Sequence, residues 1–221
     1  MALELLGAGV SPFVRKVRTL CAEKGLDYTY TPVSPFNPPE GWREVSPLGK
    51  IPALRHDGRV VNDSSVICAY LERIQPEPAL YPKAPYDYAR AVWIEEFVDG
   101  GIFPIMAPNV FLPVVLRPVL TRTPATAEVI QAAEKAVNEQ LAPLFGYLDT
   151  QLGDGEYFVG NALSIADLSV GSAFVNLRHA GFAADAARFP RLAAFVRRIH
   201  ARPSLAACIA EEKPVFGQRW V

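Results

Sequence analysis

The stretch that decides the fold is "SPFVRKVR", residues Ser11–Arg18, which follows the apolar run Leu3–Leu6 and a Gly-Ala-Gly bend. Serine is favoured at the start of a helix, and proline is favoured in its first turn. Apolar residues then recur with a helical period, and Gly25 is a typical helix end. The sequence therefore predicts a strand at residues 3–6 and a helix over residues 11–24.

Further changes of period predict the rest of a small sheet. Residues 27–33, "DYTYTPV", alternate in polarity like a strand. Residues 50–65 predict a hairpin, with strands at Ile51–Arg55 and Arg59–Asn62 around a His-Asp-Gly turn. The Pro- and Gly-rich residues 34–49 predict an ordered loop with one helical turn.

The segment "SSVICAYLERI", residues 64–74, predicts a helix that closes this first domain. Its expected buried stripe consists of Val66, Ile67, Tyr70, Leu71 and Ile74. The order strand, helix, three strands and helix predicts an α/β domain over residues 1–78.

The remainder of the chain has a helical period almost throughout. Residues 79–85 predict a linker, and residues 86–221 predict an all-helical second domain. Five prolines within residues 103–124 predict a kinked or broken helix there. Residues 123–152 predict a long amphipathic helix that bends at Pro143.

The composition argues against several classes of function. A formal net charge of −1 offers no basic excess for nucleic acid. The N-terminal residues lack the pattern of a secretion signal. The longest apolar stretch, residues 111–116, is interrupted by Pro113 and is too short to span a bilayer, so we expect no membrane insertion.

Cysteine and histidine are sparse. Cys21, Cys68 and Cys208 form an odd and scattered set, which argues against a disulfide framework and for a reducing compartment. No pair of these residue types has the spacing of metal ligands. We therefore expect a cytoplasmic protein without a metal.

Two interpretations fit the residues around Ser11. A redox enzyme of the thioredoxin type would place Cys-Pro-x-Cys at such a junction, but Ser11 and Val14 occupy the two cysteine positions here. Ser11 can serve as a helix cap alone. Arg15, Lys16 and Arg18 can form an exposed basic face, or a positive field that holds an anion at the helix N-terminus. Taken alone, these residues fit the cap and the exposed face better.

Two shorter motifs also fit both a structural and a ligand-binding interpretation. In "NDSS", residues 62–65, Asp63 or Ser64 can cap the following helix. Together they can also receive the ammonium and carboxylate of an amino-acid head. In "KIPAL", residues 50–54, a kinked start to the strand would leave the Ile51 backbone free to pair with an extended peptide.

These motifs together resemble the cytosolic glutathione transferase family. The resemblance rests on "SPFVRKVR", "KIPAL", "NDSSVICAYLE" and "GNALSIADL" in this order, and it covers essentially the whole chain. It implies the glutathione transferase fold, which joins an α/β thioredoxin-like N-terminal domain to an all-α C-terminal domain, and usually a homodimer. Ser-Pro-Phe resembles the serine-type classes, such as tau-like and bacterial members. The chain lacks the Cys-Pro-Phe of omega-type members and the Ser-Ser-Cys of zeta-type isomerases.

The resemblance also implies roles for individual residues. Glutathione, as co-substrate, would lie with its sulfur near the catalytic Ser11. Ile51 would hold the cysteinyl backbone, Asp63 and Ser64 the γ-glutamyl head, and Lys50 a carboxylate. The full set implied to bind glutathione is Phe13, Lys50, Ile51, Pro52, Asp63 and Ser64.

The pocket for the second substrate is less distinctive. Four apolar residues of the proline-rich stretch could line a cleft for a small hydrophobic electrophile, with ordinary core packing as the alternative. These are Phe103, Met106, Phe111 and Leu112.

The leading hypothesis is a glutathione transferase that activates the thiol of glutathione for attack on a small apolar electrophile. One alternative is a glutathione-dependent reductase, peroxidase or ether-cleaving enzyme on the same scaffold. Another is a non-catalytic relative that serves as an interaction or ligand-carrying protein. The joint presence of Ser11, Asp63 and Ser64 favours glutathione binding over a purely structural role.

Other conspicuous residues fit structural roles. Ser164 and Asp167 have the spacing of a capping box, and Leu163 with Leu168 predicts a hydrophobic staple. Trp93 fits a core or interface position. Cys68 and Cys208 lie on apolar helical faces and are expected to be packed rather than reactive.

Overall fold

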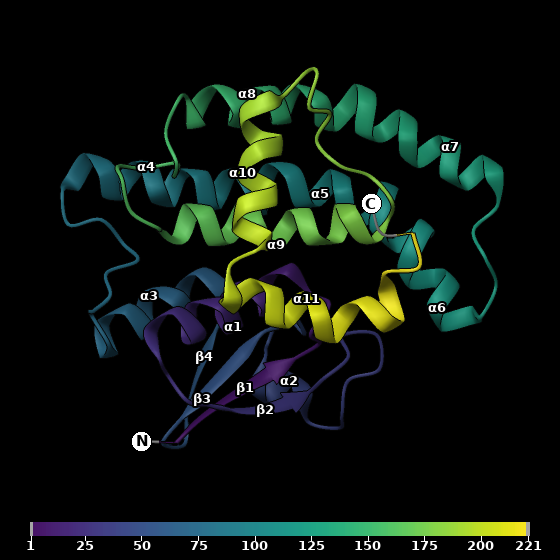
Figure 1. Cartoon of the computed structure of the whole chain (residues 1–221). Helices are drawn as coiled ribbons and strands as arrows, with labels where there is room; N and C mark the ends of the chain where they lie inside the picture. The colour runs from purple at the N-terminus through teal and green to yellow at the C-terminus, as the bar shows by residue number, and fades with distance from the viewer. Residues whose placement is uncertain (1, 220–221) are drawn as a thin grey trace. The chain divides into compact units, whose positions relative to one another are not determined.

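The structure is a computed structural model that describes residues 2–219. The chain divides into two compact units, one ending at Tyr81 and one beginning at Pro82 (Figure 1). The first is a small mixed sheet with helices, and the second is helical throughout. This is the glutathione transferase fold expected from the sequence.

The first unit follows the predicted order of elements, including the helical turn expected within residues 34–49. A four-stranded sheet has the order β2-β1-β3-β4, in which β1 and β2 are parallel and the other pairs are antiparallel. The elements are β1 (Leu3–Gly7), α1 (Pro12–Lys24), β2 (Thr29–Pro32), α2 (Trp42–Val45), β3 (Ala53–His56), β4 (Arg59–Asn62) and α3 (Ser64–Ile74). The hairpin turn uses Asp57 and Gly58, both with positive φ, as a two-residue turn of this kind requires.

The strand register places five residues at one end of this sheet. Gly7 pairs with Pro32, and Leu6 beside it pairs with Ala53, which in turn pairs with Asn62. This end is called the carboxyl end of β1 below. The segments that enter and leave the sheet there are those that carry the motifs.

Helices α1 and α3 pack against one another on one side of the sheet (Figure 1). Ile67, Cys68 and Leu71 of α3 are fully buried, whereas Val66 is 54% exposed. The expectation that Val66 is buried was wrong. One residue along a helix turns the side chain by about 100°, so Val66 lies beside the buried stripe rather than in it.

The second unit begins with one continuous helix, Pro85–Thr121. The successive parts of this helix are α4 (Pro85–Glu96), the π-helical η1 (Phe97–Ile102), α5 (Phe103–Met106), the π-helical η2 (Ala107–Leu116) and α6 (Arg117–Thr121). Of the two expectations for this region, a kinked or a broken helix, the broken helix was wrong. A carbonyl that faces a proline four residues ahead has no N–H there, but π-helical geometry lets it bond to the N–H five residues ahead.

A second composite helix is irregular near Pro143, where a bend was predicted. It consists of α7 (Ala127–Lys135), the π-helical η3 (Ala136–Leu141) and α8 (Ala142–Leu152), so the irregular segment ends two residues before Pro143. The bend itself stays a prediction. Three regular helices follow: α9 (Ile165–His179), α10 (Pro190–His200) and α11 (Pro203–Phe216). Helix α9 is buried along almost its whole length and packs against α4 and α10.

Within residues 2–219, one helix is long and apolar enough to cross a membrane by length and composition alone. It is Pro85–Thr121, with a mean hydropathy of 1.6 over its most apolar window. The core helix of a globular unit passes the same test. Of this apolar window, 39% is buried, and the α4, η1 and η2 parts of the helix pack against α9.

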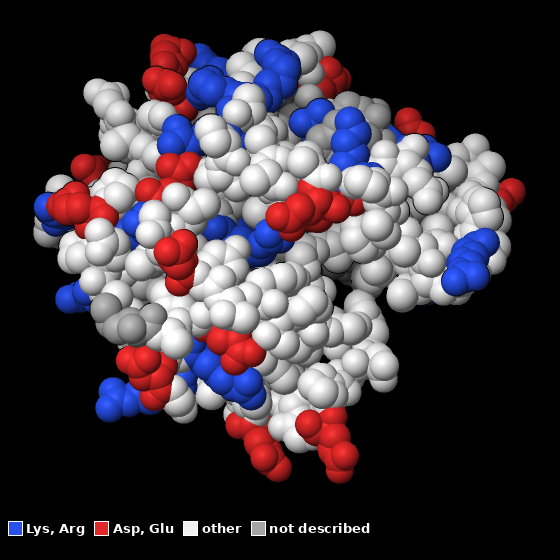
Figure 2. Space-filling view, turned by 60° about the horizontal axis from the view of Figure 1, so that its bottom comes forward, with Lys and Arg blue, Asp and Glu red and all other residues white. Residues whose placement is uncertain are grey.

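Surface charge shows no single dominant sign. On the face in Figure 2, Lys and Arg alternate with Asp and Glu. This distribution agrees with the net charge of −1 and offers no basic stripe on that face for a nucleic-acid backbone.

Candidate functional site

Three motif segments meet at the carboxyl end of β1. Ser11 follows β1, the pair Ile51–Pro52 precedes β3, and Asp63 follows β4. Because the register aligns these strand ends, residues up to 52 positions apart in the sequence lie at one edge of the sheet. The candidate site in the first unit is built from these three segments.

Ser11 is the N-cap of α1. Its Oγ accepts a hydrogen bond from the Val14 N–H at 3.5 Å, the long limit for such a bond, and Pro12 takes the first helical position. The cap is therefore weak. The half-buried hydroxyl keeps its hydrogen available for donation to a ligand beside the positive end of the helix.

The cations that follow Ser11 do not form an exposed face. Arg15 is completely buried and Lys16 is 1% exposed, so the exposed-face interpretation was wrong for both. Helical side chains lean toward the N-terminus, and Arg15 Nη2 donates to the Val10 carbonyl at 3.1 Å. Its guanidinium therefore lies near the start of α1. Arg18, by contrast, is partly exposed and lies over the Tyr30 ring.

Asp63 caps α3 and has an unusual backbone. Its Oδ1 accepts from the N–H of Ser65 at 2.9 Å and of Val66 at 3.4 Å. Its φ of 72° is uncommon for a residue with a Cβ, and such backbone strain concentrates at ligand-binding positions. Among residues 2–219, no hydrogen bond reaches Asp63 Oδ2, which can still receive an ammonium.

Ser64 adds a second polar group at the start of α3. The residue is only 4% exposed, and its hydroxyl forms no hydrogen bond with any described residue. The oxygen itself is not fully enclosed by the protein, so a ligand can reach this hydroxyl. Ser64 and the adjacent helix N-terminus therefore offer donors to an anionic group.

The segment before β3 contains a cis peptide bond, between Ile51 and Pro52. Ile51 packs against a small core that includes Trp42 and Ala53, and the Ser46 hydroxyl donates to the Lys50 carbonyl at 2.7 Å. The Lys50 side chain is exposed, so its charge is accessible to a carboxylate.

Two residues next to Asp63 and Ser64 form contacts that the sequence did not indicate. Asn62 Nδ2 donates to the Val45 carbonyl at 3.0 Å, which ties α2 to the end of β4. Ser65 Oγ accepts from Lys16 Nζ at 3.3 Å, which ties α3 to α1. Both belong to the "NDSS" motif, where the amino-acid-head interpretation used only the middle pair. Phe13 is half-buried with its ring centroid 6.0 Å from Lys16 Nζ.

The four candidate residues for an electrophile pocket lie in the second unit, on α5 and η2. Met106 and Phe111 are buried, while Phe103 and Leu112 are partly exposed. Burial of two members agrees with the core-packing alternative for those two. The pocket itself stays a prediction.

Other residues have structural roles. Trp93 is 53% exposed, so a core position was wrong, and its Nε1 donates to the Tyr147 hydroxyl at 2.6 Å. All three cysteines are buried, and burial raises the pKa of Cys21 to about 12. A neutral, buried thiol is a poor nucleophile. Within residues 2–219, no group of His, Cys, Asp and Glu could hold a metal ion.

Asp167 is the centre of the predicted capping box. Its Oδ2 accepts from both the N–H and the hydroxyl of Ser164 at 2.8 Å, and its Oδ1 accepts from the Phe158 N–H at 3.0 Å. The carboxyl group is completely buried, and this burial raises its pKa to about 6 against the effect of these hydrogen bonds. Its function is to hold the start of α9 and the loop before it.

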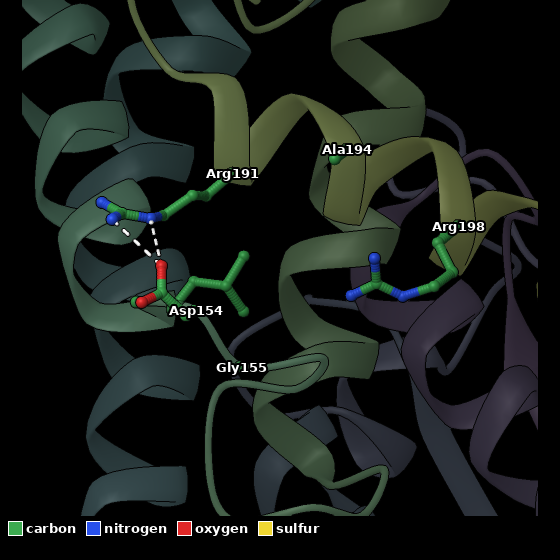
Figure 3. A pocket seen from close by; sticks show the side chains of 7 residues that line it. Asp154, Gly155, Arg191, Ala194 and Arg198 are labelled. Atoms are coloured by element: carbon green, nitrogen blue, oxygen red, sulfur yellow. Dashed lines mark hydrogen bonds and ion pairs between the residues drawn. The ribbon is translucent and has the colours of Figure 1, made fainter.

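A surface depression of about 250 Å³ lies in the second unit, between the end of α8 with the loop after it and α10 (Figure 3). Arg191 and Arg198 lie on its rim. Arg191 donates twice to Asp154 Oδ1, and Arg198 pairs with Glu156. Because both arginines already have acidic partners, nothing in this depression indicates a bound ligand.

Comparison with known proteins assigns both parts of the chain to one family. Residues 10–74 match the glutathione S-transferase N-terminal domain, and residues 116–212 match the glutathione S-transferase C-terminal domain. An uncharacterized GST-like protein, YibF of Escherichia coli, is 34% identical over 148 residues, which cover 66% of this chain and 70% of YibF.

Two further proteins illustrate the range of similarity. Rat maleylacetoacetate isomerase is 26% identical over 182 residues, covering 80% of this chain and 78% of the isomerase. The crystal structure of rice GST1 in complex with glutathione is 30% identical with a TM-score of 0.74, covering 93% of this chain and 91% of rice GST1. With matches in both units and a relative above 30% identity over most of its length, this chain belongs to the glutathione S-transferase family.

Proposed function

We propose that this chain binds glutathione at the carboxyl end of β1 and activates its thiol for attack on a small apolar electrophile. The observation that carries the proposal is the half-buried Ser11 hydroxyl, weakly engaged as a cap at the positive end of α1. Membership of the family and the glutathione-bound rice relative support glutathione as the co-substrate.

Each part of the tripeptide has a matching group at this edge. Asp63 Oδ2 receives the γ-glutamyl ammonium, and Ser64 with the N-terminus of α3 receives its carboxylate. The Ile51 backbone pairs with the cysteinyl unit, next to Pro52 and Phe13. The exposed Lys50 attracts a carboxylate at the glycyl end.

The same arrangement accounts for thiol activation. The Ser11 hydroxyl donates a hydrogen bond to the sulfur, and both the α1 N-terminus and the guanidinium of Arg15 favour the anion. These effects lower the pKa of the bound thiol, so its proton passes to water. Each unit of lowering corresponds to about 1.4 kcal/mol of preferential stabilisation of the thiolate.

The thiolate then forms a bond from sulfur to the electrophilic carbon, and the leaving group departs with the electron pair. Of the four apolar residues expected to line a cleft for the electrophile, Phe103 and Leu112 are partly exposed and can contact a ligand, whereas Met106 and Phe111 are buried. The family also implies a cytoplasmic location and a homodimer. Sedimentation of the purified chain would test the homodimer.

Substitution of Ser11 by alanine tests this proposal. The bound thiol should titrate at higher pH in Ser11→Ala than in the wild type, because the sulfur loses its hydrogen-bond donor. Glutathione affinity should change little, since the other contacts hold the peptide. The measurement is the pH dependence of thiolate absorbance in the binary complex.

Conjugation of an apolar electrophile near neutral pH should fall in parallel. A panel of electrophiles, peroxides and disulfides would identify the reaction that the wild type prefers. If the two titration curves coincide in a stable, glutathione-bound mutant, Ser11 is only a helix cap.

A further inference from the structure

We propose that Lys16 is a positioning residue that couples the start of α1 to the start of α3. The inference rests on the proposed function, because these two helix starts hold opposite parts of glutathione: α1 the thiol and α3 the γ-glutamyl head. The thiol is placed for reaction only when the separation of the two helix starts is fixed. A misplacement of about 1 Å can cost on the order of 100-fold in rate.

The bridge between the helices is a hydrogen bond between a buried and a partly buried side chain. Lys16 is 1% exposed, and its Nζ donates to Ser65 Oγ at 3.3 Å. The same ammonium lies 6.0 Å from the centre of the Phe13 ring, within the range of a cation–π interaction. Lys16 therefore contacts the first turn of both helices, and it has further interactions besides these.

The connection continues from Ser65 to the proposed head-binding carboxylate. The Ser65 N–H donates to Asp63 Oδ1 at 2.9 Å. With Oδ1 held in this way, Oδ2 is directed to the ligand. Because Asp63 has a strained backbone with φ of 72°, the surrounding contacts must maintain its orientation. The Lys16–Ser65 bond supports this orientation indirectly, because it holds the residue whose N–H bonds Asp63 Oδ1.

The chemistry of lysine supports a specific role at this position. An ammonium that is removed from water carries a large desolvation cost, and an apolar side chain of similar length would avoid this cost. Lys16 is a different case from Arg15, whose Nη2 bonds the Val10 carbonyl within the segment before α1. The geometry thus assigns charge placement beside the thiol to Arg15, and the link between the two helix starts to Lys16.

Two variants separate positioning from a simple electrostatic field. Lys16→Met removes both the charge and the bridge, whereas Ser65→Ala removes the bridge and keeps the charge. We expect each variant to weaken glutathione binding about three- to tenfold and to raise the pH midpoint of the bound thiol. The double variant should be no worse than Lys16→Met alone, because both changes break the same link. Calorimetric titration and thiolate absorbance against pH provide the two measurements.

Two control variants complete the experiment. Ser65→Thr keeps the hydroxyl, so it should recover both readouts relative to Ser65→Ala. Lys24→Met makes the same substitution at the other end of α1, where the buried Lys24 pairs with Glu72 at 2.6 Å and bonds two backbone carbonyls. This control should lower the urea midpoint without moving the pH midpoint of the bound thiol.

The outcomes distinguish this inference from the proposed function. If wild-type protein binds glutathione with a lowered thiol pKa but Ser65→Ala behaves like wild type, the positioning role of Lys16 is refuted and the proposed function stands. Additive effects of Lys16→Met and Ser65→Ala would also refute it. If the wild type shows no glutathione binding, both proposals fall. Should Lys16→Met not fold, Ser65→Ala and Ser65→Thr decide the question alone.

Discussion

Asp63 combines a structural and a proposed binding role that two substitutions can separate. Its Oδ1 caps α3, while Oδ2 is assigned to the ammonium of glutathione. Asp63→Asn keeps an oxygen for the cap and tolerates positive φ, but it removes the charge. We expect glutathione affinity to fall about 10- to 100-fold, the usual consequence of losing a charged hydrogen-bond partner, with the urea midpoint nearly unchanged.

Asp63→Ala provides the comparison. It should lose the same affinity and, in addition, about 1 kcal/mol of unfolding free energy from the missing cap. Calorimetric titration and urea unfolding of both variants measure the two effects. Wild-type affinity in Asp63→Asn would remove the carboxylate from the binding site and leave Asp63 as a cap alone.

For single residues, the sequence predicted helix caps more accurately than it predicted which side chains are buried. Ser11 and Asp63 could be identified as caps because capping depends on a few adjacent residues. The burial of Lys16 and the exposure of Val66 depend on what packs against each helix, which local sequence does not contain. The role of Ser65 was missed for the same reason, since its partner lies 49 residues away.

At the scale of single elements, the start of α9 depends on one buried carboxyl group. Asp167 accepts three hydrogen bonds, from two Ser164 groups and the Phe158 N–H. Asp167→Ala would leave these donors buried without a partner. We expect a loss of about 2–4 kcal/mol in unfolding free energy, measured by urea titration, with glutathione affinity retained. Loss of glutathione binding in a variant of unchanged stability would contradict a purely structural role.

The same group predicts a pH dependence of stability. The pKa of Asp167 is about 6 in the folded chain against 3.8 as a free side chain, so the folded state binds the proton more tightly. Its contribution to stability is thus complete below about pH 4 and is lost as the pH rises through about 6, amounting to about 3 kcal/mol. The difference in unfolding free energy between wild type and Asp167→Asn should change over this range. A constant difference would show that Asp167 does not titrate there.

The elements also show where local rules fail. The first unit follows its predicted order because its strands, turn and helices each have a distinct period. Residues 103–124 were expected to form a kinked or broken helix, since proline interrupts the hydrogen bonds of an α-helix, but the helix Pro85–Thr121 is continuous. Its π-helical segments shift those bonds by one residue, an adjustment that depends on tertiary packing.

At the scale of the whole molecule, topology assembles the candidate site. The sequence contained the motifs at Ser11, Ile51 and Asp63 but did not show that they share one edge. Pairing of β3 with both β1 and β4 brings them together. The four residues proposed for the electrophile lie in the other unit. Their apolar side chains carry no pattern that separates a pocket from a core.

Glutathione should stabilise the whole chain against heat, because a ligand that binds only the folded state adds its binding free energy to folding. At 100 times its dissociation constant the gain is about 2.7 kcal/mol, so the melting temperature should rise with the logarithm of glutathione concentration. All the proposed glutathione contacts lie before Tyr81, and the buried Trp42 in that unit provides a fluorescence signal for its unfolding. Ser11→Ala should keep the shift, and Asp63→Asn should reduce it at equal glutathione concentration. A melting temperature that does not respond to glutathione in the wild type would identify this chain as a family member that has lost its co-substrate.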